Sequence, residues 1–291
     1  MQICDPVEEA VITRLRDRFQ VVERNDVQNT DADVLVVRSR TRISRRVIES
    51  AKNLKIIARP GVGVDNIDVD AAAEYGIKII NSPQASTRSV AELTLGLILS
   101  LARSIPRADQ ALRKGYWKKK DLKGCEVAGK TMGILGLGKI GYEVARLCHA
   151  LSMEVIYWSR HRKPDREVAA DIAYVSFEEL FRRSDFLSIH TALTTATRGI
   201  VGRRELSWMK LGSCLINTAR GALVDEVALY EVLQTGRIRG AGLDVFSEEP
   251  YSGSLRKLAT VVLTPHIGAN THEAQLRSGT FIADAIIATL T

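Results

Sequence analysis

The sequence predicts an α/β fold with two doubly wound domains, each built on a parallel sheet. Short apolar runs of strand length alternate with amphipathic helical stretches along most of its 291 residues, and this alternation is typical of parallel sheets covered by helices. The length favours two domains over one. With 45% hydrophobic and 26% charged residues, the composition is that of an ordinary globular protein with enough apolar side chains for two cores.

The first eighty residues show this alternation clearly. We predict strands at residues 2–4, 34–37, 56–58 and 78–80, and helices at residues 6–19, 44–51 and 69–75. Ligands of such sheets collect beyond the carboxyl ends of the strands, where the chain carries Arg38, Ser39 and Arg40, then PGVG at residues 60–63. Two arginines beside an open glycine loop indicate an anion pocket. A solvated loop next to an ordinary turn would have the same sequence pattern.

A long helix is predicted to follow. Ser86 or Thr87 can cap it, and it is expected to run to about Arg113. Its first half is apolar on nearly all sides, which indicates a helix buried at a domain or subunit interface. Glu92 within it would then need a buried partner.

Residues 131–150 (TMGILGLGKIGYEVARLCHA) combine a strand, a glycine turn and a helix. Gly136 can make the tight turn, Gly138 has no side chain to hold off a pyrophosphate, and Gly141 lets the helix approach the strand. The first N–H groups of that helix would face the phosphates of a dinucleotide. We therefore predict a Rossmann-type cofactor site on Gly136, Gly138, Lys139, Ile140 and Gly141, the alternative being a turn kept for packing alone.

The next strand, residues 154–158, ends in Ser159, Arg160, His161 and Arg162. NAD-selective sites usually have Asp or Glu at this place, bonded to the ribose 2′-hydroxyl. A hydroxyl and guanidinium groups bind a 2′-phosphate, which a carboxylate would repel. Ser159, Arg160 and Arg162 therefore favour NADP(H) over NAD(H), unless Arg160 merely stacks on the adenine.

The remaining strands are predicted at residues 186–190, 214–217, 242–245 and 261–263. Each ends in polar or charged residues, and the carboxyl ends of parallel strands face one side of a sheet. The expected cluster comprises His190, Thr191, Asn217, Thr218, Ala219, Arg220, Asp244 and His266. His272 follows in a helix and is expected on the surface.

Charge and cysteine usage exclude several classes of protein. The net charge of +7 suits an anionic ligand, but the basic residues are dispersed and 118–120 is the only run of three, so no nucleic acid partner is expected. The four cysteines form no C-x-x-C pair, which predicts a reduced, cytoplasmic protein without disulfides or a metal site. The start of the chain lacks the features of a signal peptide.

Taken together, the motifs resemble the D-isomer-specific 2-hydroxyacid dehydrogenases over essentially the whole chain. The matching stretches are residues 59–68 (RPGVGVDNID), 87–92 (TRSVAE), the glycine turn, 217–225 (NTARGALVD), 241–250 (AGLDVFSEEP) and 265–269 (PHIGA). Within the family, residues 38–41, 86–89 and 115–119 are most similar to D-3-phosphoglycerate dehydrogenases. The resemblance implies a Rossmann-type domain, in which Gly268 would also contact the cofactor, and a flavodoxin-like substrate domain.

The resemblance further implies a catalytic set of Arg220, Glu249 and His266. His266 would exchange a proton with the substrate oxygen as hydride moves, because an imidazole titrates near neutral pH. Glu249 would hold the ring and favour its protonated form. Arg220 would fork onto the substrate carboxylate and carbonyl.

For the substrate, the resemblance implies that the backbone of Val62 and Gly63 holds the carboxylate. A phosphate would lie on Arg38, Ser39, Arg40 and Ser86, with Lys119 arriving from a neighbouring subunit, or Lys118 or Lys120 after a slip of one residue. The expected reaction is NAD(P)-dependent oxidation of D-3-phosphoglycerate in serine biosynthesis. Because the strand end at Ser159 is similar to that of NADP-using glyoxylate or hydroxypyruvate reductases, such a reductase is the nearest alternative, and a dinucleotide-sensing corepressor is a distant one.

We expect residues 1–82 and 267–291 to form the substrate-binding domain, and residues 83–266 the NAD(P)-binding domain, hinged around a cleft. The long apolar helix is the expected surface of a homodimer. Since the sequence ends at Thr291, a carboxy-terminal serine-sensing domain and feedback through it are not expected.

Overall fold

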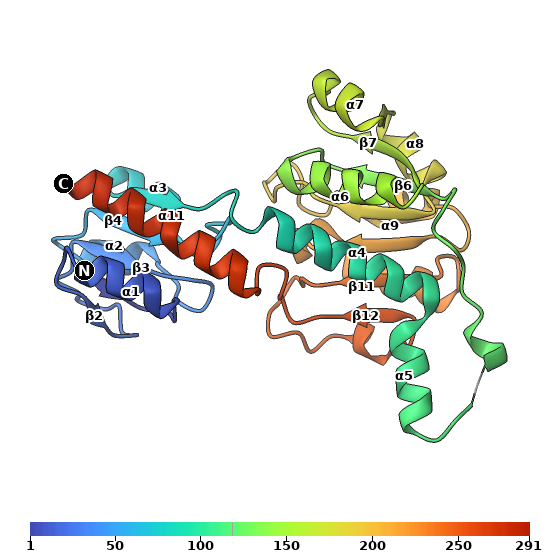
Figure 1. Cartoon of the computed structure of the whole chain (residues 1–291), viewed down its shortest axis with the longest axis horizontal. Coiled ribbons are helices and arrows are strands. Elements are labelled where there is room, and N and C mark those ends of the chain that lie inside the picture. The colour runs from blue at the N-terminus through green and yellow to red at the C-terminus, as the bar shows by residue number, and fades with distance from the viewer. Residues whose placement is uncertain (118) are drawn as a thin grey trace. The chain divides into compact units, whose positions relative to one another are not determined.

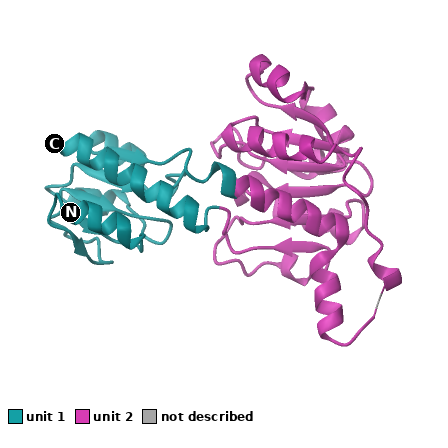
Figure 2. Ribbon diagram, viewed as in Figure 1, with its two compact units in different colours: residues 1–89, 269–291 teal, residues 90–268 magenta. Residues whose placement is uncertain are grey.

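The chain folds into two compact units in a computed structural model that describes residues 1–117 and 119–291. Unit 1 comprises residues 1–89 and 269–291, and unit 2 comprises residues 90–268 (Figure 2). The expected divisions, after residues 82 and 266, lie a few residues earlier. The difference at the first division arises because Arg277 in the C-terminal helix donates to the carbonyl of Ala85 at 2.9 Å, so that the segment after β5 stays with unit 1.

Unit 1 is built on a five-stranded sheet whose strands are all parallel, in the order β2-β1-β3-β4-β5 (Figure 1). The strands are β1 (Gln2–Ile3), β2 (Val22–Glu23), β3 (Val34–Val36), β4 (Ile56–Arg59) and β5 (Lys78–Asn81). The sequence does not predict β2, because this edge strand has two exposed residues and no apolar run.

Helices cover both faces of this sheet, as a doubly wound fold requires. They are α1 (Glu9–Arg16), α2 (Arg45–Ser50), α3 (Val69–Glu74) and the C-terminal α11 (His272–Leu290). One apolar cluster contains Val47, Ile48 and Ala71 from α2 and α3, and the other contains Leu15 and Ile282 from α1 and α11. α11 therefore completes the core of unit 1, although most of that unit precedes it by nearly two hundred residues.

Unit 2 is built on a seven-stranded parallel sheet in the order β12-β11-β10-β9-β6-β7-β8 (Figure 1). The strands are β6 (Thr131–Leu135), β7 (Glu154–Trp158), β8 (Ala173–Tyr174), β9 (Phe186–Ile189), β10 (Cys214–Asn217), β11 (Gly240–Leu243) and β12 (Val261–Leu263). The strand order reverses beside β6, and ligands of such sheets bind at this switch point. The predicted α/β class with two doubly wound parallel sheets is confirmed.

Two details of this sheet differ from the prediction. β11 begins and ends two residues earlier than predicted, because Gly240 and Ala241 do not read as strand residues. Gly240 is required there, since a Cβ would lie 2.6 Å from the backbone oxygen of Thr260. β8 is missed because it has only two residues.

The helices of unit 2 surround its sheet. They are α4 (Thr87–Arg103, whose first residues belong to unit 1), α5 (Ile105–Arg113), α6 (Lys139–Ala150), α7 (Pro164–Ala170), α8 (Phe177–Arg183), α9 (Arg203–Trp208) and α10 (Glu226–Gln234), with 3-10 turns η1 (Lys119–Leu122), η2 (Gly221–Leu223) and η3 (Ser254–Lys257). Within the described ranges no single helix is long and apolar enough to cross a membrane; α4 and α5 pass that test of length and composition only as a bent pair.

Residues 87–113 form two helices, not the single helix that the sequence predicts. α4 and α5 are bent by 64° at Ser104, whose φ is 53°. Pro106 in the first turn of α5 has no N–H with which to continue α4. One side of α4 packs in the core of unit 2, but Glu92 on another side is exposed, so a single chain does not bury this helix on all sides.

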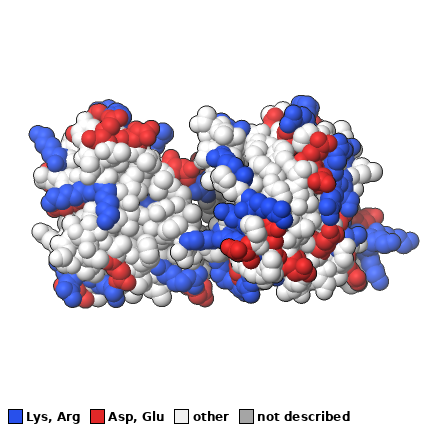
Figure 3. Space-filling view, turned by 90° about the horizontal axis from the view of Figure 1, so that it is seen from above, with Lys and Arg blue, Asp and Glu red and all other residues white. Residues whose placement is uncertain are grey.

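Charged side chains of both signs are mixed on the surface. On the face of each unit that Figure 3 shows, Lys and Arg lie among Asp and Glu.

Candidate active site

The turn between β6 and α6 has the features of a dinucleotide-binding loop. Gly136 has φ 100°, and a Cβ there would lie 2.8 Å from the backbone nitrogen of Thr191. A Cβ on Gly141 would overlap the carbonyl oxygen of Gly136, whereas no atom lies within 4 Å of a Cβ built on Gly138. Two of the glycines are therefore needed for packing, and Gly138 opens the turn toward a ligand. With Lys139 and Ile140 in the first turn of α6, these residues fit a bound pyrophosphate.

The end of β7 carries the residues predicted to choose between NAD(H) and NADP(H). Ser159 is half-buried and donates through Oγ to the carbonyl of His161 at 3.3 Å, while Arg160 is exposed. Arg162 is held by Glu167, with Nη2 and Oε2 2.8 Å apart. Its charge is therefore already paired within the chain.

His190 and Thr191 follow β9, beside the glycine turn. The Oγ of Ser188 lies 2.8 Å from Nε2 of His190, and burial lowers the pKa of His190 to about 3. This imidazole is therefore neutral at physiological pH. His190 can line the site in this form, but it is not suited to donate a proton to a substrate.

The turn after β10 positions Arg220. Asn217 holds this turn, since its Nδ2 donates to the carbonyl of Arg220 at 2.9 Å and its Oδ1 accepts from the N–H of Ala219 at 3.0 Å. Thr218 is anchored through its Oγ1, which lies 2.9 Å from that of Thr94. A Cβ on Gly221 would overlap the backbone of Phe246, so the glycine lets the turn that carries Arg220 pack against the loop that leads to Glu249.

Asp244 is buried and organises the turn that carries His266. Its Oδ1 accepts from the Oγ1 of Thr264 at 2.6 Å and from the N–H of Ile267 at 2.8 Å, and its Oδ2 accepts from the N–H of Gly268 at 2.8 Å. The backbone oxygen of Asp244 also accepts from the N–H of His266 at 2.8 Å. His266 has φ 54°, a conformation that these contacts support.

His266 and Glu249 form a pair at this end of the sheet. Nδ1 of His266 lies 2.8 Å from Oε2 of Glu249, and the two side chains are 43% and 37% exposed. Partial burial raises the pKa of Glu249, but hydrogen bonds from His266 and from the N–H of Phe246, together with the charges of His266 and Arg220, outweigh burial and lower it overall. A carboxylate thus orients the ring and leaves Nε2 for a ligand.

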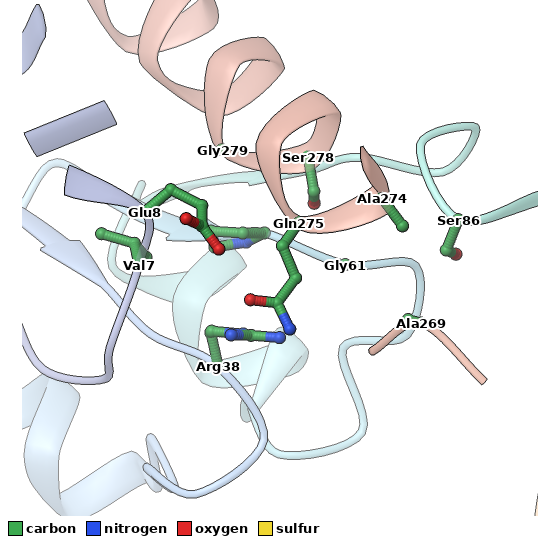
Figure 4. Close-up of a pocket in the computed structure, with 11 residues that line it drawn as sticks. Val7, Glu8, Arg38, Gly61, Ser86, Ala269, Ala274, Gln275, Ser278 and Gly279 are labelled. Carbon is green, nitrogen blue, oxygen red and sulfur yellow. The ribbon is translucent and has the colours of Figure 1, made fainter. Parts of the chain in front are cut away.

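Unit 1 has a pocket of its own. Side chains that share it come from four parts of the unit, namely Glu8 before α1, Arg38 after β3, Ser86 before α4, and Gln275 and Ser278 on α11. Figure 4 shows the polar ends of Glu8, Arg38 and Gln275 directed into the same space. Ser39 and Arg40 are exposed and do not line this pocket.

The loops around this pocket are held by side chains from neighbouring segments of unit 1. Asp5 accepts from the backbone N–H of Arg38, and Asn66 donates to the carbonyl of Arg38 at 2.7 Å. The loop at Val62 is fixed by Nδ2 of Asn81, which donates to its carbonyl at 2.7 Å. No residue in the described part of the chain accepts a hydrogen bond from the N–H groups of Val62 and Gly63, which fits the expectation that they bind a carboxylate.

Comparison with known proteins identifies the family. The family model described as "D-isomer specific 2-hydroxyacid dehydrogenase, NAD binding domain" matches residues 95–268. The chain belongs to this family. The matched segment coincides with most of unit 2, so the open glycine turn lies in a nicotinamide dinucleotide-binding domain.

Individual members of the family resemble the chain over most of its length. A D-3-phosphoglycerate dehydrogenase of Methanocaldococcus jannaschii is 49% identical over 258 residues, which is 88% of this chain and 49% of that protein. A hydroxypyruvate reductase of Thermotoga maritima is 49% identical over 260 residues, which is 88% of this chain and 84% of that protein. A glyoxylate reductase of Paecilomyes thermophila has a crystal structure that matches with a TM-score of 0.91 and 34% identity, covering 99% of this chain and 94% of that one. The chain thus spans about half the length of the phosphoglycerate dehydrogenase that it matches.

The structure brings together part of the set predicted from the sequence. His266 contacts Glu249, and the charge of Arg220 acts on Glu249. Arg38 and Ser86 share one pocket. Lys119 and Lys120 lie exposed in η1, and Lys118 lies outside the described residues.

Several residues at these sites are not predicted from the sequence. Glu8 before α1 and Gln275 and Ser278 on α11 enter the pocket from segments far apart in the chain, and no motif connects them. Asp5 carries a weak signal, because it follows the first strand directly.

Proposed function

We propose that this member of the family transfers a hydride between a nicotinamide dinucleotide and C2 of a small D-2-hydroxy acid. The observation that carries the proposal is the His266–Glu249 pair, held at 2.8 Å in unit 2 together with Arg220 and the open glycine turn. An imidazole oriented by a carboxylate is suited to general acid–base catalysis near neutral pH. A neighbouring guanidinium binds a carboxylate with two parallel hydrogen bonds.

In the proposed mechanism the chain positions the substrate and moves one proton. Nε2 of His266 gives a proton to the carbonyl oxygen during reduction and takes it back during oxidation. Glu249 keeps the ring of His266 in place through Nδ1. Arg220 aligns the carboxylate and the carbonyl of the substrate, so that the reacting atoms are held in the geometry needed for transfer. The bound nicotinamide supplies or accepts the hydride. The N–H groups of Val62 and Gly63 would hold the substrate carboxylate.

For the substrate we propose D-3-phosphoglycerate, oxidised to 3-phosphohydroxypyruvate at the entrance to serine biosynthesis. Arg38 and Ser86 in the pocket of unit 1 offer a guanidinium and a hydroxyl to the phosphate. The guanidinium of Arg59 lies beside Gly61, which lines the same pocket, and adds a second positive charge nearby. The relative from M. jannaschii is named for this activity.

A second candidate is a glyoxylate or hydroxypyruvate reductase that uses NADPH. Two observations favour it. Glu8 places a carboxylate in the pocket that holds Arg38, and a carboxylate repels a phosphate dianion. The end of β7 carries Ser159 and Arg160 in place of an acidic residue, which supports a preference for NADP(H). The relative from T. maritima is named a hydroxypyruvate reductase.

Initial rates with 3-phosphohydroxypyruvate, hydroxypyruvate and glyoxylate, each with NADH and with NADPH, test both proposals. A large advantage in kcat/KM for the phosphorylated substrate supports phosphoglycerate oxidation. Faster reduction of hydroxypyruvate or glyoxylate with NADPH overturns it in favour of the reductase. Activity on none of the three contradicts both.

We also propose that the chain forms a homodimer, in which Lys119 reaches the substrate bound to the partner. The sequence places the contact on the long apolar helix that corresponds to α4 and α5, and one side of α4 packs in the core of unit 2. The large apolar side chains left exposed nearby are Ile105, Leu112, Tyr116 and Trp117, on and after α5. A mass measurement in solution tests this proposal, and a monomer at micromolar concentration would contradict it.

A further inference from the structure

Arg166 on α7 is tied to the glycine turn. Its Nη1 donates to the carbonyl of Leu137 at 2.7 Å and to that of Gly138 at 2.8 Å. Its guanidinium also lies 5.1 Å from the ring centre of Tyr142 on α6, at the distance of a cation–π contact. Arg166 is half-buried, so a charged group is held in one place beside the loop that receives the phosphates of the dinucleotide.

The rest of this guanidinium is open to a ligand. An arginine has donors on Nη1, Nη2 and Nε, and only Nη1 of Arg166 has a hydrogen-bond partner among the described residues. Nη2 and Nε therefore remain for an acceptor that the chain does not supply.

The position of Arg166 matches one part of the cofactor. In Rossmann-type sites the pyrophosphate lies on the glycine turn, and the residue that follows the second strand meets the ribose 2′ position. α7 begins six residues after β7 ends at Trp158, and Arg166 reaches back from α7 to the glycine turn. Its guanidinium thus lies beside the glycine turn, on the helix that follows the loop expected at the ribose 2′ position.

The sequence predicts that Arg162 contacts the 2′-phosphate, but the structure pairs this residue with Glu167. Its Nε lies 2.9 Å from Oε1 of Glu167, and its Nη2 lies 2.8 Å from Oε2 of that residue. Glu167 is held in turn by the hydroxyl of Tyr157 at 2.6 Å. Moving Arg162 onto a ligand would leave a largely buried carboxylate, 12% exposed, without its cation.

We propose that Arg166 is a specificity residue for the cofactor and that it binds the 2′-phosphate of NADP(H) together with Ser159 and Arg160. This inference rests on the proposed preference for NADP(H). Arg166 is a cation of the 2′-phosphate site that no sequence motif indicates. Arg162, in contrast, is assigned the role of holding Glu167.

Binding of 2′,5′-ADP and of ADP, measured by titration calorimetry on the whole chain, tests the proposal without turnover. Arg166→Gln should weaken 2′,5′-ADP and NADPH by about 10- to 100-fold, the effect of losing a charge-assisted hydrogen bond, and should weaken ADP and NADH by less than about threefold. Arg166→Lys should recover part of the loss. Arg162→Gln tests the competing assignment: if Arg162 only holds Glu167, this variant should leave the preference for the 2′-phosphate unchanged.

The outcomes separate this inference from the proposed use of NADP(H). If the wild type binds 2′,5′-ADP no better than ADP, the proposed preference fails and the role of Arg166 fails with it. If the wild type prefers 2′,5′-ADP but Arg166→Gln weakens both probes equally, Arg166 only holds the glycine turn and the inference alone is overturned. Loss of the preference in Arg162→Gln, with Arg166→Gln unaffected, would return the role to Arg162.

Discussion

Nδ1 of His266 lies 2.8 Å from Oε2 of Glu249, although the two residues are 17 positions apart. The contact depends on two other elements. Asp244 fixes the turn that carries His266, and the N–H of Phe246 donates to the second carboxylate oxygen of Glu249 at 3.0 Å. The pair is thus built by loops at the carboxyl ends of neighbouring strands.

The pair predicts how stability depends on pH. The folded state lowers the pKa of Glu249 from 4.5, so its contribution to stability is fully present above the ordinary value and is lost as the pH falls through the folded value. The difference in unfolding free energy between the wild type and Glu249→Gln should therefore be constant near neutral pH. It should shrink only below about pH 4.5. Urea denaturation at stepped pH measures it, and a difference that already vanishes at about pH 6 would contradict the assignment.

Two alanine substitutions in the glycine turn should have different effects, one on cofactor binding and the other on stability. Gly138→Ala meets no atom within 4 Å and has an extended φ of -74°, so it should change the unfolding free energy by less than about 1 kcal/mol. It should nevertheless weaken dinucleotide binding, because the added methyl occupies the ligand side of the turn. Gly141→Ala overlaps the carbonyl of Gly136 and should cost about 1–3 kcal/mol.

Denaturation and cofactor titration of both glycine variants check this contrast. Gly138→Ala with unchanged affinity for NADH and NADPH would show that the open side of the turn does not receive the cofactor.

Glu8 predicts a change in substrate preference. Replacing it with Gln removes a negative charge from the pocket of Arg38, which should raise kcat/KM for 3-phosphohydroxypyruvate about fivefold or more relative to hydroxypyruvate, an effect of about 1 kcal/mol. Glu9→Gln is the matched control, because Glu9 is exposed and does not line the pocket. Equal changes in both variants would show that the effect comes from overall charge.

Much of the fold could be predicted from the sequence, because its signals are local. The bounds of β6, β7, β10 and β12 follow directly from short apolar runs that end in glycine or polar residues. The break at Ser104 could not be predicted from apolar periodicity, which continues across it, although Pro106 is a signal for it.

The candidate sites are predicted less completely, because they depend on contacts between distant segments. The sequence indicates His266 by its place after a strand and Glu249 through the family resemblance, but their contact is a property of folded loops. Gln275 and Ser278 meet Arg38 only after α11 packs in unit 1. Arg166 reaches the glycine turn across nearly thirty residues of chain, and its side chain carries no motif that would indicate this.

The most direct test of the account is the turnover of His266→Ala, measured together with its affinity for the cofactor. If His266 exchanges the proton, kcat should fall by about 10²- to 10⁴-fold, while the dissociation constants of NADH and NADPH stay within about twofold of the wild type. A fall in kcat of less than about tenfold, with the fold intact, would show that another group moves the proton and would contradict the central claim.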